Sequence, residues 1–177
     1  LRRALAVPPE SAVGERAVYS DIGFMLLGEV LAKVGGAPLD QLFAARIAEP
    51  FALGASYRRL SSRRPLPTHC APTGKRRPRD PAPGQEGTFD VEPAQSRPGE
   101  VDDDNAWCMD GVSGHAGLFA TSEAIARYGQ VILESRLVPP SPWAHDAHTP
   151  GSTRALGFDT PGDEAPSCGP RINTGAI

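Results

Sequence analysis

The sequence predicts a largely helical chain whose helices are separated by long loops rich in proline and glycine. Apolar side chains recur at helical spacing in three segments, over residues 22–34, over residues 39–48 and after residue 121. Glycine and proline together make up 38 of the 177 residues, 19 of each, which is about 21% against an ordinary share near 12%. We therefore expect the apolar core to be concentrated in these few segments.

Length and charge limit the classes of function. A chain of 177 residues can form one domain with a core of its own. Its 18 basic and 21 acidic side chains give a formal net charge of -3, so no general positive field attracts polyanions and nucleic-acid binding is disfavoured. The three cysteines are widely spaced and odd in number, which argues against a disulfide framework and a zinc site and favours free thiols. They are Cys70, Cys108 and Cys168.

The segment 22–34 carries the strongest helix prediction. Glu29 and Lys33 lie on the face opposite its apolar side chains, four residues apart in the favourable order. These charges and the length of the segment argue against a transmembrane span. Gly28 costs about 1 kcal/mol relative to alanine within a helix, so we expect a close backbone contact at this position. Gly35-Gly36 ends the helix.

A second helix and a long loop follow. Pro38 suits the first position of a helix over residues 39–48, and Pro50 closes it. Beyond this helix proline recurs too densely for a helix or a central strand, and we expect a loop excursion over residues 61–105. The basic cluster at residues 75–79 lies within it, and we favour a solvated surface over a phosphate-binding patch as its interpretation.

Order is expected to return with the glycine-rich turn that begins at Gly111 and leads into a third helix. Thr121 or Ser122 can cap this helix. Its buried face would be formed by Ile125, Tyr128 and Ile132. Further along, a short strand could start at residues 156–158.

The tripeptide Tyr19-Ser20-Asp21 directly precedes the first helix. On local grounds, Ser20 or Asp21 caps the helix and Tyr19 packs against it. The longer segment YSDIGFMLLGEVLAKVGG, followed by PLDQLFAARIAEPFALGAS, resembles the Y-S-N-x-G-Y-x-L-L-G block of the serine beta-lactamase and penicillin-binding-protein superfamily, in its class C and esterase-like branch.

A second block carries the same resemblance. The segment GEVDDDNAWCMDGVSGHAGLFATSEAIARYGQVILE is similar to one that reads roughly V-H-D-x-N-A, then G-H-A-G-L-F-S-T, then a helix of D-L-A-R-F type. The two blocks occur in the family's order. The resemblance implies an α+β fold of the beta-lactamase and transpeptidase type, to which this chain contributes mostly helical-subdomain segments and long loops.

The resemblance also implies a bacterial serine hydrolase that cleaves amide or ester bonds of a small-molecule or peptide-like substrate through an acyl-enzyme, without a metal or cofactor. Tyr19 stands at the position of the family's catalytic tyrosine, whose phenol shuttles a proton between the nucleophilic serine and the leaving group. Asp21 stands where the lactamases usually carry asparagine; it can pair with the catalytic lysine, and this departure suits an esterase-like member. His115 would lie on the substrate side, and the alternative is a histidine satisfied by local backbone groups.

Both flanking motifs of that family are missing. No lysine lies three residues after a serine, so S-x-x-K is absent, and no clear K-T-G or H-T-G motif follows. Asn173-Thr174-Gly175 imitates this final motif, and we favour a chance match over a degenerate third motif. We therefore expect residues 1–177 to be an internal part of a hydrolase domain, inactive alone because the nucleophile lies outside it. The alternative is a non-catalytic remnant, a pseudoenzyme or a binding module. The chain shows no signal peptide, and cytoplasmic and bacterial-envelope locations both stay open, as does the oligomeric state.

Three other patterns carry weaker signals. His145 and His148 have the spacing of metal ligands, but the surrounding prolines disfavour the helix that would align them. The acidic run 102–104 with Asn105 lacks the spacing of a calcium loop and is typical of turns and helix caps. Ser113 lacks the G-x-S-x-G context of a nucleophile elbow. The sequence therefore predicts no metal site and gives little support to a Ser-His-Asp hydrolase.

Overall fold

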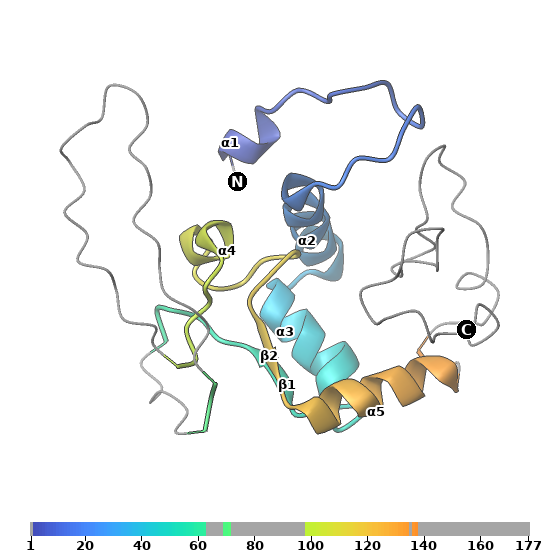
Figure 1. Cartoon of the computed structure of the whole chain (residues 1–177), viewed down its shortest axis with the longest axis vertical. Coiled ribbons are helices and arrows are strands. Elements are labelled where there is room, and N and C mark those ends of the chain that lie inside the picture. The colour runs from blue at the N-terminus through green and yellow to red at the C-terminus, as the bar shows by residue number, and fades with distance from the viewer. Residues whose placement is uncertain (1, 63–68, 72–97, 135, 138–177) are drawn as a thin grey trace, which may run out of the picture.

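The structure is a computed structural model that describes residues 2–62, 69–71, 98–134 and 136–137. Helices dominate these ranges and are joined by one two-stranded sheet (Figure 1). Several features singled out in the sequence lie outside the described residues. They are the basic cluster 75–79, His145 and His148, the candidate strand 156–158, Cys168, and Asn173-Thr174-Gly175.

The first strong helix prediction is confirmed. Helix α2 spans Asp21–Gly35, after a short helix α1 over Arg2–Leu5. Ser20 caps α2, because its hydroxyl accepts a hydrogen bond from the backbone N–H of Gly23 at 3.2 Å. Gly36 ends the helix in the left-handed conformation with φ 70°, which glycine adopts without the Cβ penalty.

The second helical segment, predicted over residues 39–48, has this extent but two geometries. It begins as α3 over Leu39–Phe43 and continues as a π-helical turn, η1, over Ala44–Ala48. The wider turn shows in hydrogen bonds across five residues, from Glu49 N–H to the carbonyl of Ala44 at 2.9 Å and from Leu53 N–H to that of Ala48 at 2.8 Å. Local apolar spacing predicts the helix but does not distinguish these two hydrogen-bond patterns.

Strands β1, over Ala55–Tyr57, and β2, over Leu118–Ala120, pair antiparallel. The sequence analysis missed both, because three residues are too few to show the alternation typical of a strand. Ser56 pairs with Phe119 at the centre of the register. The pairing brings together the chain before the proline-rich excursion and the chain after it, so the excursion starts and ends at one place in the fold.

The part of the chain after the excursion contains one helix that was missed and one that was predicted. Helix α4, over Asp104–Cys108, starts inside the predicted excursion 61–105 and before residue 111, where order was expected to return. Helix α5 spans Ser122–Leu133, and Thr121 caps it by accepting from the N–H of Ala124 at 3.1 Å. Cys70 and Cys108 are free thiols, as expected.

The buried face of α5 differs from the prediction. Ala124 and Val131 are its buried residues, whereas Ile125, which the prediction placed in the core, is 58% exposed. The buried face is therefore rotated by about one residue, 100° around the helix axis. The small side chain of Ala124 explains this, since it allows α5 to start close against Gly54 just ahead of β1.

The buried apolar residues are mostly small and come from α2, η1, α4, α5 and the connecting segments beside them. They are Met25, Ala48, Leu53, Val101, Ala106, Val112, Ala124 and Val131. Among the described residues, no single helix is long and apolar enough to cross a membrane; only α2 taken together with residues 39–48, as a pair bent by 73°, has the necessary length and composition.

Candidate active site

The predicted tyrosine motif lies where the chain enters α2. Tyr19 is 77% exposed, Ser20 caps the helix, and Asp21 is its first residue. A carboxylate in the first turn is stabilised by the positive end of the helix dipole. Within the motif, Ser20 therefore has the structural role of capping α2. The side chains of Tyr19 and Asp21 do not serve as this cap.

The glycine-rich turn that carries His115 packs directly against the backbone of α2. A Cβ added to Gly28 would lie 3.1 Å from the backbone nitrogen of Gly114, and a Cβ added to Gly114 would collide with the carbonyl oxygen of Phe24. Only two glycines allow the two backbones to approach this closely. The close contact expected at Gly28 is thus confirmed, and it places the turn beside the first half of α2.

His115 is 5% exposed at its side chain and is held at both ring nitrogens. Nδ1 lies 2.8 Å from the hydroxyl oxygen of Ser113, and Nε2 lies 2.8 Å from a carboxylate oxygen of Asp103. A neutral imidazole satisfies both contacts when the Ser113 hydroxyl donates to Nδ1 and the Nε2–H donates to Asp103. The partners are side chains, not the backbone groups that the sequence analysis considered as the alternative.

Asp103 links this cluster to α4. The carboxylate oxygen that meets His115 also accepts the N–H of Ala106 at 2.7 Å and so caps α4. Burial opposes ionisation of Asp103, but the hydrogen bonds from Ala106 and His115 outweigh it and hold the pKa of this carboxyl below its ordinary value. The interpretation of the acidic run as capping chemistry is confirmed at Asp103.

Two of the predicted site residues come together here. A carboxylate oxygen of Asp21, one of Asp103 and a ring nitrogen of His115 all lie within 4.8 Å of one another. These are atom types that bind cations, but both nitrogens of His115 are already hydrogen-bonded and Asp103 caps a helix. A cation at this place would break those bonds, so the hydrogen bonds of this cluster argue against a metal site.

Ser113, His115 and Asp103 are the residue types of a serine hydrolase triad. However, Ser113 is 1% exposed, and no substrate carbonyl can reach a hydroxyl buried to this extent. The cluster is therefore a buried connection between the turn and α4. Sequence reasoning missed Asp103 and Ser113 as partners of His115, although the cap position of Asp103 was a usable signal.

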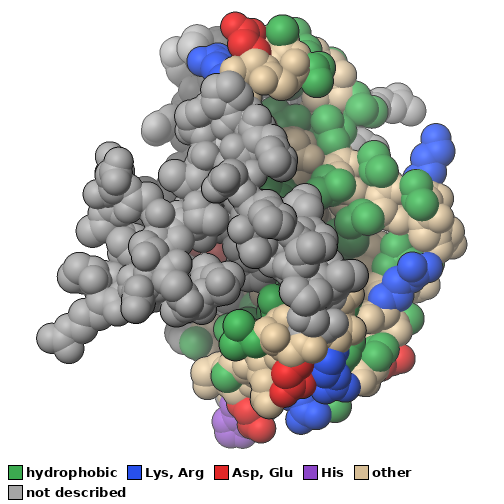
Figure 2. Space-filling view, turned by 90° about the vertical axis from the view of Figure 1, so that its right-hand side faces the viewer, with side chains coloured by type: hydrophobic (Ala, Val, Ile, Leu, Met, Phe, Trp, Pro, Cys, Tyr) green, Lys and Arg blue, Asp and Glu red, His purple; other side chains and the backbone are tan. Residues whose placement is uncertain are grey.

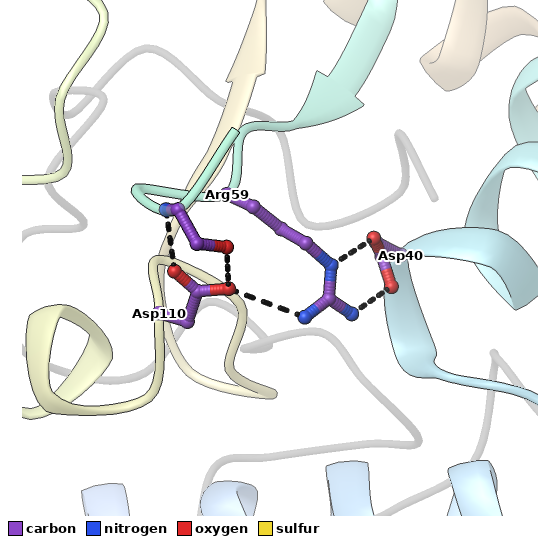
Figure 3. A network of polar contacts seen from close by, with 4 residues as sticks. Asp40, Arg59 and Asp110 are labelled. Carbon is purple, nitrogen blue, oxygen red and sulfur yellow. Dashed lines mark hydrogen bonds and ion pairs between the residues drawn. The ribbon is translucent and has the colours of Figure 1, made fainter. Parts of the chain in front are cut away.

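A second polar network fixes the other side of the same turn (Figure 3). The guanidinium of Arg59 donates to both carboxylate oxygens of Asp40, at 2.8 and 2.7 Å, and reaches Asp110 at 3.4 Å. Asp110 also accepts the N–H and the hydroxyl of Ser61, each at 2.7 Å. The hydrogen bond from Arg59 lowers the pKa of Asp40 against the opposing effect of burial. The network joins α3 to both ends of the excursion.

A cavity of about 390 Å³ lies between α2, α3 and the chain from Cys108 to Gly114. Polar and apolar groups contribute about equally to its lining, and Glu29 and Arg59 are its charged residues. Ser113 and Gly114 form part of its wall, so the cavity borders the turn that carries His115. Tyr57 of strand β1 contacts the same turn, since its hydroxyl donates to the carbonyl of Ser113 at 3.1 Å.

Comparison with known proteins identifies the class. Residues 1–165 match the Beta-lactamase family, so the chain belongs to this family, as its two motif blocks indicated. It is 34% identical over 130 residues to an N-acetylmuramyl-L-alanine amidase of Bacillus subtilis (strain 168), a match that covers 72% of this chain and 28% of the relative. It is 31% identical over 132 residues to a Salmonella agona (strain SL483) protein named for D-alanyl-D-alanine carboxypeptidase activity, covering 71% of this chain and 29% of that protein.

A solved structure supports the same fold. The penicillin binding protein from Bacillus halodurans matches with a TM-score of 0.52 at 16% sequence identity, over 78% of this chain and 38% of its own. The α+β fold of the beta-lactamase and penicillin-binding-protein type is thereby confirmed. The family includes proteins named as amide-bond hydrolases, and this chain spans less than a third of the length of the two relatives above.

Proposed function

We propose that this chain is part of a serine hydrolase domain that cleaves amide or ester bonds through an acyl-enzyme. The observation that carries the proposal is the placement of Tyr19 and Asp21 at the start of α2, with Asp21 within 4.8 Å of the hydrogen-bonded pair His115 and Asp103. The names of the relatives favour peptide-like substrates with amide bonds, as in cell-wall fragments.

Each residue has a defined part in the proposed reaction. A serine of an S-x-x-K motif outside residues 1–177 attacks the substrate carbonyl, and its proton passes to the oxygen of Tyr19 as the phenol gives its own proton to the neutral amine of the motif lysine. Tyr19 returns that proton to the leaving amine or alcohol, and water then releases the acyl group. Asp21 pairs with the motif lysine, and His115 with Asp103 fixes the turn beside α2. In this proposal Asp21, His115 and Asp103 do not exchange a proton with the substrate.

The first experiment tests where the nucleophile lies. The 177-residue chain is incubated with a fluorophosphonate and with a labelled penicillin, and covalent labelling is followed by mass spectrometry. We expect no label on this chain. A label on any of its serines would contradict the proposal that the nucleophile lies outside it.

The second experiment tests Tyr19. The matched 130-residue segment of the Bacillus subtilis relative is replaced by the corresponding residues of this chain, and acylation of the resulting chimera is measured. We expect Tyr19→Phe to slow acylation by about two to four orders of magnitude, since it removes a general acid–base group. Tyr128→Phe in α5 serves as the control and should leave the rate unchanged.

The alternative of a non-catalytic remnant or binding module of the same fold is favoured by the missing S-x-x-K motif alone. A chimera that folds like the parent enzyme but is not acylated even with Tyr19 intact would support this alternative. An active chimera that depends on Tyr19 would exclude it for the segment tested.

A further inference from the structure

His115 is a buried titratable group that takes no part in the proton transfers of the proposed reaction. Its side chain is 5% exposed, and both ring nitrogens are hydrogen-bonded, Nδ1 to Ser113 and Nε2 to Asp103. In the neutral ring the Ser113 hydroxyl donates to Nδ1. A second proton on Nδ1 reverses this bond, so that the ring donates and the hydroxyl oxygen accepts. The ring can therefore take up a proton while it keeps both contacts.

Two carboxylates face this ring from the helices beside it. Asp103 lies at the N-cap of α4, and Asp21 lies in the first turn of α2. One carboxylate oxygen of each and a ring nitrogen of His115 all lie within 4.8 Å of one another. The turn over residues 111–117, which carries His115, contributes no other charged side chain. Both charged groups facing the ring within this cluster are therefore negative.

The closeness of these groups makes the charge of the ring important. On the face of the molecule drawn in Figure 2, acidic and basic side chains lie scattered among hydrophobic ones, whereas the cluster around His115 gathers two carboxylates in one place. The carboxylates repel each other beside a neutral ring, and an imidazolium attracts both. Because the side chain of His115 is shielded from water, this attraction is screened less than one between exposed groups.

The two carboxylates differ in how firmly they are held. Asp103 accepts hydrogen bonds from the N–H of Ala106 and from the ring, which fixes it at the start of α4. Asp21 is not the cap of its own helix, since Ser20 has that role. A positive charge on His115 therefore acts mainly on the position of Asp21. In the proposed reaction this carboxylate stabilises the ammonium that forms on the motif lysine.

We infer that His115 is a positioning residue: its neutral form leaves the carboxylate of Asp21 to the motif lysine, and its protonation draws that carboxylate toward the ring and slows acylation. The inference rests on the proposed function, because the lysine belongs to the S-x-x-K motif outside residues 1–177. It adds an acid limit to the reaction that is set by a residue out of contact with the substrate. The rate of acylation then falls as the pH drops through the range in which histidine titrates.

The pH profile of acylation tests this role. Acylation by labelled penicillin is measured from about pH 5 to about pH 9 in the chimera with the Bacillus subtilis relative, with and without His115→Gln. Glutamine can donate to Asp103 and accept from Ser113, but it does not titrate. We expect the parent chimera to lose about tenfold more of its rate toward low pH than the His115→Gln variant, the effect of one pKa unit on the motif lysine. His69→Gln, at an exposed histidine, serves as the control and should leave the profile unchanged.

Asp21→Asn separates this role from a merely structural one. In that background the ring has no carboxylate of Asp21 to attract, so His115→Gln should no longer change the shape of the profile. A purely structural residue would change the rate by the same factor at every pH and in both backgrounds, and that result would overturn the inference. Profiles of the same shape with and without His115 would also overturn it.

A second measurement depends neither on acylation nor on the stability of the His115→Gln variant. Nuclear magnetic resonance of the chimera, labelled with isotopes at histidine, gives the pH at which the His115 ring takes up its proton. We expect Asp21→Asn to lower this pH, because the substitution removes a negative charge within 4.8 Å of the ring. The same pH in both proteins would overturn the inference. A lowered pH in a chimera that is not acylated would refute only the proposed function.

Discussion

Replacing Gly114 by alanine should drive α2 away from the turn that carries His115. The added Cβ would collide with the carbonyl oxygen of Phe24, a backbone atom within a helix, so relief requires a shift of a whole element. Gly114 does not have a positive φ, and the cost is therefore steric and not conformational. Overpacking of this kind destabilises a fold by about 1–3 kcal/mol, and occasionally by more.

A second glycine provides a matched control. A Cβ added to Gly129, in the interior of α5, meets nothing within 4 Å, so Gly129→Ala should stabilise the chain by up to about 1 kcal/mol through helix propensity alone. The assay is urea denaturation followed by circular dichroism at 222 nm. The two substitutions should change the free energy of unfolding in opposite directions. A Gly114→Ala variant as stable as the parent chain would refute the proposed backbone contact.

Two further predictions concern charged groups. The pKa of Asp103 is lowered in the folded chain, so its ionised form contributes stability at pH values above the ordinary pKa near 3.8, and this contribution is lost as the pH falls through the lower folded value. Asp103→Asn retains a capping oxygen but should flatten the loss of stability measured by urea denaturation between pH 7 and pH 2; an unchanged acid slope would contradict this. Arg59→Met leaves Asp40 without its bidentate partner and should lower the free energy of unfolding by about 1 kcal/mol. Arg16→Met, in the exposed pair with Glu10, serves as the control and should have a negligible effect. Equal shifts of the melting temperature for the two variants would contradict this prediction.

The helices were predictable because their signals are local. Ser20 and Thr121 cap the helices that follow them, and Gly36 ends α2 in the left-handed conformation. Each of these signals lies within a few residues of the boundary that it sets. The strands were not predictable in this way, because Ala55 pairs with Ala120 across 65 residues of sequence and each strand has three residues. Such a pairing leaves no periodic pattern in either segment.

The buried faces were less predictable than the helices themselves. Apolar periodicity predicts Ile125 in the core of α5, but the small side chain of Ala124 permits the closer approach and takes that place. On α2 the row that contains Met25 is buried and the row of Leu27, Leu31 and Val34 is exposed, and apolar spacing alone does not distinguish the two rows. Which row is buried depends on the rest of the fold.

The candidate site was predictable only in part. The resemblance to the beta-lactamase superfamily pointed to Tyr19, Asp21 and His115, and the structure places Asp21 and His115 within 4.8 Å of a third residue, Asp103. The catalytic part of Tyr19 stays a prediction for the labelling experiments. Ser113 and Asp103 were missed as partners of His115, because their contacts arise from the turn and from α4, which are positioned by tertiary packing.

The pairing of β1 with β2 makes the geometry of the site independent of the length of the chain between the two strands. Residue 58 directly follows β1 and residue 117 directly precedes β2, and the two strands are hydrogen-bonded to each other. Nearby, the N–H of Leu60 donates to the carbonyl of Asp110 at 3.1 Å. Closing a flexible loop costs a free energy that grows only with the logarithm of its length, and each doubling of the length adds about 0.6 kcal/mol. We therefore expect a change in the number of residues between 62 and 98 to leave the position of His115 relative to α2 unchanged.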